Sequence, residues 1–123
     1  MKRLLLLSLA CIATTHAQTV DYTKQIAPLW DSYCVDCHSA DDADGEFALD
    51  TFAALMKGGE EGAAIVAGKA EESLLVKFLE GRSGRGGKNE FKPPGKRDKL
   101  KGGEIALIKA WIKAGAKGPP EAE

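Results

Sequence analysis

Two cysteines and one histidine lie close together in the sequence, at Cys34, Cys37 and His38. On a helical turn, residues three and four positions apart lie on the same face. The segment Cys34-Val35-Asp36-Cys37-His38 therefore presents two thiols and one imidazole side by side. No other feature constrains the fold as strongly, because three reactive side chains must face the same space.

Residues 1–17 have the pattern of a secretory signal peptide. A basic start at residues 1–3 precedes an apolar run at 4–13, and small residues follow at Thr15 and Ala17. The apolar run is well short of the ~20 residues that a membrane-spanning helix needs. We expect cleavage after Ala17 and no stable membrane span afterwards. Lipidation at Cys11 is the alternative interpretation.

Removing this segment leaves residues 18–123, a length that fits one domain. Cys11 and His16 leave with it, so the motif then holds both remaining cysteines and the remaining histidine. Aromatic residues make up only 7% of the chain, and a bound apolar group would help so short a chain to form a core. Acidic side chains outnumber basic ones, 18 to 17, and nucleic-acid binding is not expected.

The spacing C-x-x-C-H is the attachment signal for c-type haem. The two thiols can add to the vinyl groups of a haem, and His38 then lies beneath the iron as its proximal ligand. Other interpretations fit less well. A structural disulfide leaves His38 unexplained, a thioredoxin-like motif should follow a strand, and a zinc site needs a fourth ligand. We predict one covalently bound haem c on Cys34, Cys37 and His38, in a periplasmic or secreted protein.

Apolar residues at helical spacing predict an all-α fold with long connections. The first predicted helices are 23–34, with Ile26, Leu29, Trp30 and Tyr33 inward, and one carrying Leu49, Phe52, Ala53 and Met56 that ends at Gly58-Gly59. The others are 71–80, with Leu74, Leu75, Phe78 and Leu79 inward, and 104–114, with Ile105, Ile108, Trp111 and Ile112 inward. Pro28 is expected to start or kink the first helix. A basic, glycine-rich loop is predicted at 81–103 and a short tail at 116–123.

Several weaker segments accompany the haem motif in a consistent order: Gln25 to Leu29, Leu49-Asp50 with Gly58-Gly59, Ile65 to Gly68 with Ser73 to Leu75, Pro93-Pro94, and Glu104 to Ala116. With these segments the chain resembles a small cytochrome c domain of the planctomycete type. The resemblance implies a cytochrome c-like fold in which the N- and C-terminal helices cross and the haem edge is exposed. It makes Trp30 and Trp111 candidates for the helix crossing or the haem wall.

The resemblance also implies a second axial ligand, commonly a methionine directly before the Pro-Pro pair. That position is Lys92 here, and Met56 is the only methionine outside the signal segment. Met56 lies at helical spacing from Phe52, so core packing is its expected role. Lys92 could bind iron only as the neutral amine, and deprotonating an ordinary lysine at pH 7 costs about 4.6 kcal/mol. Four alternatives stay open for the second axial ligand: Lys92, Met56, water or no ligand.

The resemblance implies one-electron transfer with a redox partner rather than an enzymatic activity. The alternative function is a haem domain with an open sixth site that binds small ligands or acts as a weak peroxidase. Residues 82–101 carry a net charge of +6. Such a loop beside the haem would steer an acidic partner to it, although runs of charge are often simply solvated.

Overall fold

The computed structural model describes residues 12, 19–82 and 92–120. The helices in order are η1 (Tyr22–Ile26), α1 (Ala27–Tyr33), η2 (Asp44–Glu46), α2 (Phe52–Lys57), η3 (Ala70–Glu72), α3 (Leu74–Leu79) and α4 (Gly102–Lys113). Within these residues β pairing is limited to two isolated bridges, so the predicted all-α class is confirmed for the described chain. None of the helices described is long and apolar enough to cross a membrane. The predicted signal segment falls outside the described residues, apart from Ile12.

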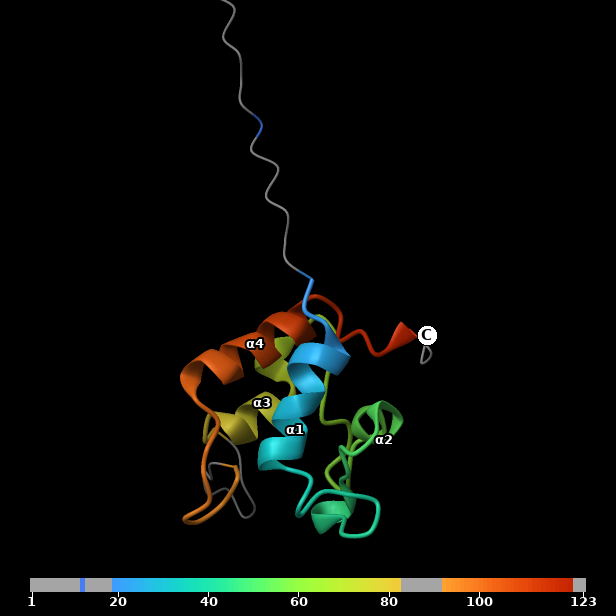
Figure 1. The fold of residues 1–123 in the computed structure, drawn as a ribbon, viewed down its shortest axis with the longest axis vertical. Coiled ribbons are helices and arrows are strands. Elements are labelled where there is room, and N and C mark those ends of the chain that lie inside the picture. Colours follow the sequence, from blue (N-terminus) through green and yellow to red (C-terminus); the bar gives the residue numbers. More distant parts are fainter. Residues whose placement is uncertain (1–11, 13–18, 83–91, 121–123) are drawn as a thin grey trace, which may run out of the picture.

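The first and last helices of the described chain cross. The π-helix η1 runs directly into α1, and Pro28 lies in the first turn of α1, where a helix does not need its missing N–H. Figure 1 shows η1 and α1 lying across α4, and η1 contacts α4. The rings of Tyr22 and Trp111 lie 5.4 Å apart at this contact. The crossing therefore has the arrangement that the sequence resemblance implied.

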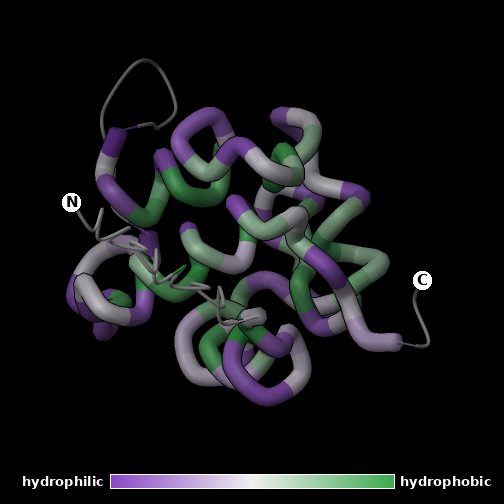
Figure 2. Tube along the Cα trace, turned by 90° about the horizontal axis from the view of Figure 1, so that it is seen from above, coloured by the Kyte–Doolittle hydropathy of each residue, from purple (hydrophilic) through white to green (hydrophobic). Residues whose placement is uncertain are grey.

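The hydrophobic core fills the space between these helices. Its largest fully buried apolar side chains are Trp30, Trp111, Ile26, Leu55, Ile108, Ile112 and Val76. Figure 2 shows hydrophobic segments in the middle of the molecule and hydrophilic residues in many of the outer turns. Trp111 donates a hydrogen bond from Nε1 to the carbonyl of Lys117 at 2.9 Å. The beginning of the expected tail is therefore packed against the core.

The second helix differs from its prediction. It begins at Phe52, so Leu49 lies before the helix and its spacing does not define a helical face. Phe52 and Met56 pack against the core as predicted, but Ala53 is exposed, and the prediction omitted Leu55, which is the buried side chain of this helix. The predicted end is confirmed, because the helix stops at Gly58, where φ is +79°.

The third predicted helix, 71–80, is two helices separated by the buried Ser73. The Ser73 hydroxyl donates to the carbonyl of Lys69 at 2.9 Å and accepts from the N–H of Val66 at 2.9 Å. The backbone at Ser73 is extended, with a ψ of 125°. The uninterrupted helix was therefore a wrong prediction, because these local hydrogen bonds compete with helix continuation.

The fourth helix begins two residues earlier than predicted, at Gly102. The carboxylate of Glu104 accepts a hydrogen bond from the N–H of Lys101 at 2.7 Å, which satisfies a free donor at the helix start. Two glycines assigned to the predicted loop are therefore helical. Residues 92–101 are irregular, as expected, and 83–91 lie outside the described residues.

Four charged side chains join η3, α3 and α4. Arg82 donates to Glu80 at 2.8 Å and to Glu71 at 2.9 Å, and Lys109 pairs with the same two carboxylates. The hydrogen bond from Arg82, aided by Lys109, holds the pKa of Glu80 below its usual range. Arg82 belongs to the predicted basic loop, yet it is tied to neighbouring acids.

Candidate haem-binding site

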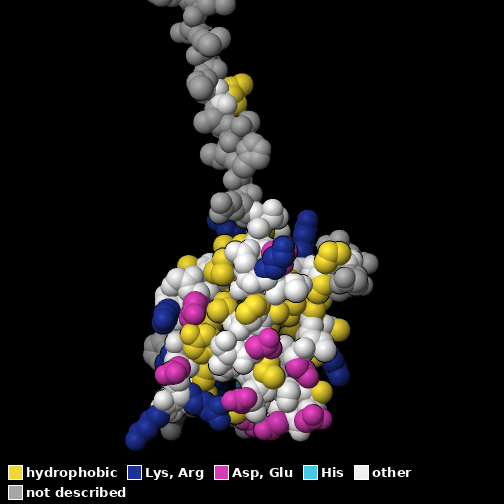
Figure 3. All heavy atoms as spheres, viewed as in Figure 1, with side chains coloured by type: hydrophobic (Ala, Val, Ile, Leu, Met, Phe, Trp, Pro, Cys, Tyr) yellow, Lys and Arg dark blue, Asp and Glu magenta, His cyan; other side chains and the backbone are white. Residues whose placement is uncertain are grey.

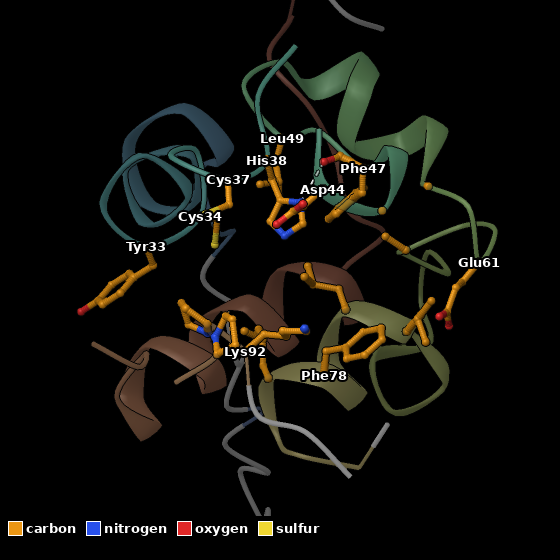
Figure 4. Close-up of a pocket in the computed structure, with 18 of the residues that line it drawn as sticks. Tyr33, Cys34, Cys37, His38, Asp44, Phe47, Leu49, Glu61, Phe78 and Lys92 are labelled. Atoms are coloured by element: carbon orange, nitrogen blue, oxygen red, sulfur yellow. Dashed lines mark hydrogen bonds between the residues drawn. The ribbon is translucent and has the colours of Figure 1, made fainter. Parts of the chain in front are cut away.

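A cavity of about 410 Å³ lies between the segment that follows α1 and the helix α3. This volume is within the range of about 300–1,000 Å³ that small-molecule and cofactor sites occupy in proteins. Cys34, Cys37 and His38 lie on one wall, and α3 contributes apolar side chains to the other. Further lining residues come from 92–94, from Arg97 and from the segments 44–49 and 59–64. Figure 4 shows this arrangement.

The cysteine–histidine motif is a turn that continues α1. The N–H groups of Cys37 and His38 donate to the carbonyl of Cys34 at 3.2 and 3.0 Å. All three side chains line the same cavity. The structure thus brings together the three residues that the spacing placed on one face.

The imidazole of His38 is oriented by the backbone. Its Nδ1 lies 2.9 Å from the carbonyl oxygen of Phe47, which only accepts hydrogen bonds, so Nδ1 carries the proton. Nε2 then keeps its lone pair, and Figure 4 shows the His38 ring reaching into the cavity. A backbone carbonyl that accepts a hydrogen bond from one ring nitrogen and so fixes the tautomer is usual for a metal-binding histidine.

Both motif cysteines are free thiols, so the structure does not contain the disulfide of the competing interpretation. Burial raises the pKa of Cys34 to about 12. Dithiol oxidoreductases need a cysteine whose pKa is lowered, so the environment of Cys34 disfavours a thioredoxin-like role. The described residues also hold no group of three histidines, cysteines or carboxylates that could bind a metal ion by themselves.

The apolar residues of α3 serve two surfaces. Val76 is buried in the core alone. Leu75 and Leu79 are buried and also line the cavity, together with the half-buried Leu74 and Phe78. The sequence placed Leu74, Leu75, Phe78 and Leu79 inward, and all four line the cavity, but it omitted the buried Val76. A helix that contacts the core on one side and the cavity on another carries apolar residues on both sides. The spacing of these residues does not show which of them face the core and which face the cavity.

The donor set and walls of the cavity fit a haem. Two thiols and an imidazole nitrogen face the space from one side, and Leu74 and Phe78 offer an apolar surface to a flat, largely apolar ring. Arg97 also lines the cavity, and a guanidinium is suited to the carboxylates of the haem propionates. The cavity therefore matches the group that the motif predicts.

The two protein candidates for the second axial position lie in different places. Lys92 lines the cavity, and its Nζ is 5.7 Å from the centroid of the Phe78 ring. Met56 is on α2, is half-buried and packs against the core, and it is not among the residues that line the cavity. Trp30 and Trp111 are core residues that likewise do not line it.

Gly59 allows the segment of Phe47 to approach the cavity. A Cβ atom at Gly59 would lie 2.7 Å from the carbonyl oxygen of Gly45 and 2.8 Å from Cβ of Phe47. The neighbouring N–H of Glu60 donates to the same Gly45 carbonyl at 2.8 Å. The absence of a side chain at Gly59 therefore helps to place the carbonyl that orients His38.

We expect Gly59→Ala to lower the free energy of unfolding by about 1–3 kcal/mol, the usual cost of overpacking. The matched control is Gly103→Ala, because Gly103 is helical and its added Cβ would meet nothing within 4 Å. That control should be neutral or stabilising by up to about 1 kcal/mol. Urea denaturation of both variants measures the difference. Equal unfolding midpoints for Gly59→Ala and the unmodified protein would contradict the role of Gly59.

The family model described as planctomycete cytochrome C matches residues 34–83. No curated protein and no solved structure matches the chain. The matched segment begins at Cys34 and contains the complete attachment motif, the Gly58-Gly59 pair and α3. The match confirms that the chain resembles a planctomycete-type cytochrome c domain, a family that suggests a haem-binding cytochrome.

Proposed function

We propose that this protein is an exported electron-transfer protein with one covalently bound haem c. The observation that carries the proposal is the shared cavity of Cys34, Cys37 and His38, with Nε2 of His38 facing inward. When bound, haem supplies an iron centre that gains or loses one electron. The two cysteines hold the group, and His38 binds its iron from one side.

The rest of the cavity would control the chemistry of that centre. The Phe47 carbonyl keeps His38 in the tautomer that can bind iron. Leu74 and Phe78 exclude water from the opposite side, and exclusion of water is one of the levers on redox potential. We propose electron exchange as the role of this centre and no enzymatic reaction.

The charges suggest where a partner docks. Residues 92–101 of the basic loop contain Lys92, Lys96, Arg97, Lys99 and Lys101 against the single acid Asp98. Figure 3 shows basic side chains at one lower corner of the molecule and acidic side chains along the neighbouring lower edge. We propose that a partner with an acidic face approaches the loop beside the cavity, where charge complementarity speeds association. The pattern of the first seventeen residues supports a periplasmic or secreted location.

Expression with a c-type haem maturation system tests the proposal. The purified protein should be heavier than the processed polypeptide by the mass of one haem, and the difference should persist under denaturing conditions. Its absorption spectrum should change reversibly on reduction and reoxidation. A colourless protein without the added mass would overturn the proposed function.

A further inference from the structure

We propose that Lys92 is the second axial ligand, binding the iron through Nζ from the wall of the cavity that faces His38. This inference rests on the proposed haem function and specifies its coordination. It also decides between the electron-transfer proposal and the alternative of an open sixth site, because a lysine bound to iron would close that site to small ligands.

Lys92 is held on the cavity wall that faces His38. Its backbone N–H donates to the carbonyl of Phe78 at 3.1 Å, which fixes the residue beside α3. Figure 4 shows His38 entering the cavity from one wall and Lys92 lying with Phe78 on the facing wall. Lys92 Nζ lies 5.7 Å from the centroid of the Phe78 ring, so the half-buried side chain follows this apolar wall.

Hydrogen bonds within the loop after Lys92 hold its backbone in place. Lys99 donates from Nζ to the carbonyls of Pro93 at 2.9 Å and Gly95 at 3.1 Å. Pro93 and Leu100 are buried, which ties both ends of this turn to the protein. A ligand whose backbone is already fixed loses less conformational entropy when it binds a metal.

The other lining residues are less suited to bind iron opposite His38. Arg97 has no lone pair to offer a metal, because its guanidinium only donates hydrogen bonds. The hydroxyl of Tyr33 is bonded to Glu104 at 3.2 Å, and Figure 4 shows its ring directed away from the cavity centre. Asp44 lies on the same wall as His38. Glu60 and Glu61 also line the cavity, but both are exposed, whereas Lys92 is half-buried. Lys92 thus combines a potential lone pair with a position on the facing wall.

Binding requires a balanced exchange at one nitrogen. The ammonium of Lys92 loses one proton to solvent, its lone pair forms the bond to iron, and water that held the position leaves. No electron is transferred in this exchange. Lysine is suited to it, because its charge state responds readily to burial, whereas arginine stays protonated. Methionine ligation raises the redox potential of a haem, so a lysine ligand should give a lower potential.

The test compares the haem-loaded unmodified protein with Lys92→Arg, Lys92→Met and the control Lys96→Arg. We expect the unmodified ferric protein to be low-spin in electron paramagnetic resonance, and its ferrous form to bind carbon monoxide slowly and incompletely. Lys92→Arg keeps the positive charge but removes the ligand, so the low-spin signal should be lost and carbon monoxide should bind fast and completely. Lys92→Met should raise the midpoint potential. Lys96→Arg should behave like the unmodified protein, because Lys96 is an exposed residue that does not line the cavity.

A high-spin unmodified protein, or a Lys92→Arg variant that stays low-spin, would overturn the proposal. Nuclear magnetic resonance of the reduced unmodified protein is a second measurement that needs no variant. The side-chain protons of a lysine bound to iron should be strongly shifted by the haem ring current, and their absence would also overturn it. Each variant should retain the mass of one haem. Failure of the unmodified protein to bind haem would instead count against the proposed function itself.

Discussion

A protein in which Cys34 and Cys37 are both serine is expected to lose all covalently bound haem. Each thiol is free in the structure, and both line the cavity together with His38. Serine has nearly the same shape but cannot form the thioether bond. After expression with the maturation system, the intact mass under denaturing conditions should equal that of the polypeptide alone.

The matched control is Cys11→Ser, which removes the chain's third cysteine and leaves the motif intact. This control should still carry one haem. Each single variant, Cys34→Ser or Cys37→Ser, should retain at most one thioether bond. Retention of haem by the double variant through denaturation and gel electrophoresis would refute attachment at these residues.

The central part of the site could be predicted because it is local in sequence. A turn of helix requires only neighbouring residues, so the spacing of Cys34, Cys37 and His38 was sufficient to place them on one face. The partner of the imidazole could not be found in this way. Phe47 contributes a backbone carbonyl, which has no side-chain signature, and its position depends on the close approach of Gly59.

The same distinction applies to the helices. The predicted helix ends at Gly58, at residue 80 and at residue 114 lie at or directly before a glycine of positive φ, namely Gly58, Gly81 and Gly115. Glycine adopts this conformation without the cost paid by other residues. The directions of the helix faces were harder to predict. Phe78 and Leu74 fit a core stripe in the sequence, yet they line a cavity that depends on segments distant in the chain.

The sequence identified Lys92 as a candidate iron ligand but did not show whether its side chain faces the cavity or the solvent. A lysine in a loop with many basic residues is usually solvated. The hydrogen bond to the Phe78 carbonyl and the contact with the Phe78 ring place Lys92 on the cavity wall instead. These are contacts across sequence-distant segments, and no local pattern encodes them.

Replacing Trp111 by alanine is expected to lower the free energy of unfolding by about 3–5 kcal/mol, the usual cost of removing a buried aromatic side chain. Trp111 is only 1% exposed, and its ring centroid lies 5.4 Å from that of Tyr22. Its Nε1 donates a hydrogen bond to the carbonyl of Lys117. The substitution would leave a cavity where η1 and α4 cross. Domains of this size have a total stability of about 5–15 kcal/mol, so the variant should unfold at much lower urea concentrations.

The absorption spectrum of the Trp111→Ala variant distinguishes an effect on the hydrophobic core from an effect on the haem site. Trp111 does not line the cavity, so variant molecules that remain folded should keep the absorption spectrum of the unmodified haem protein. The exposed α4 residue Lys113 provides a control, and Lys113→Ala should change stability by no more than about 0.5 kcal/mol. A loss below about 1 kcal/mol for Trp111→Ala would mean that the helix crossing contributes little to stability. An altered spectrum in the folded variant would instead show that the core at this crossing helps to position the haem ligands.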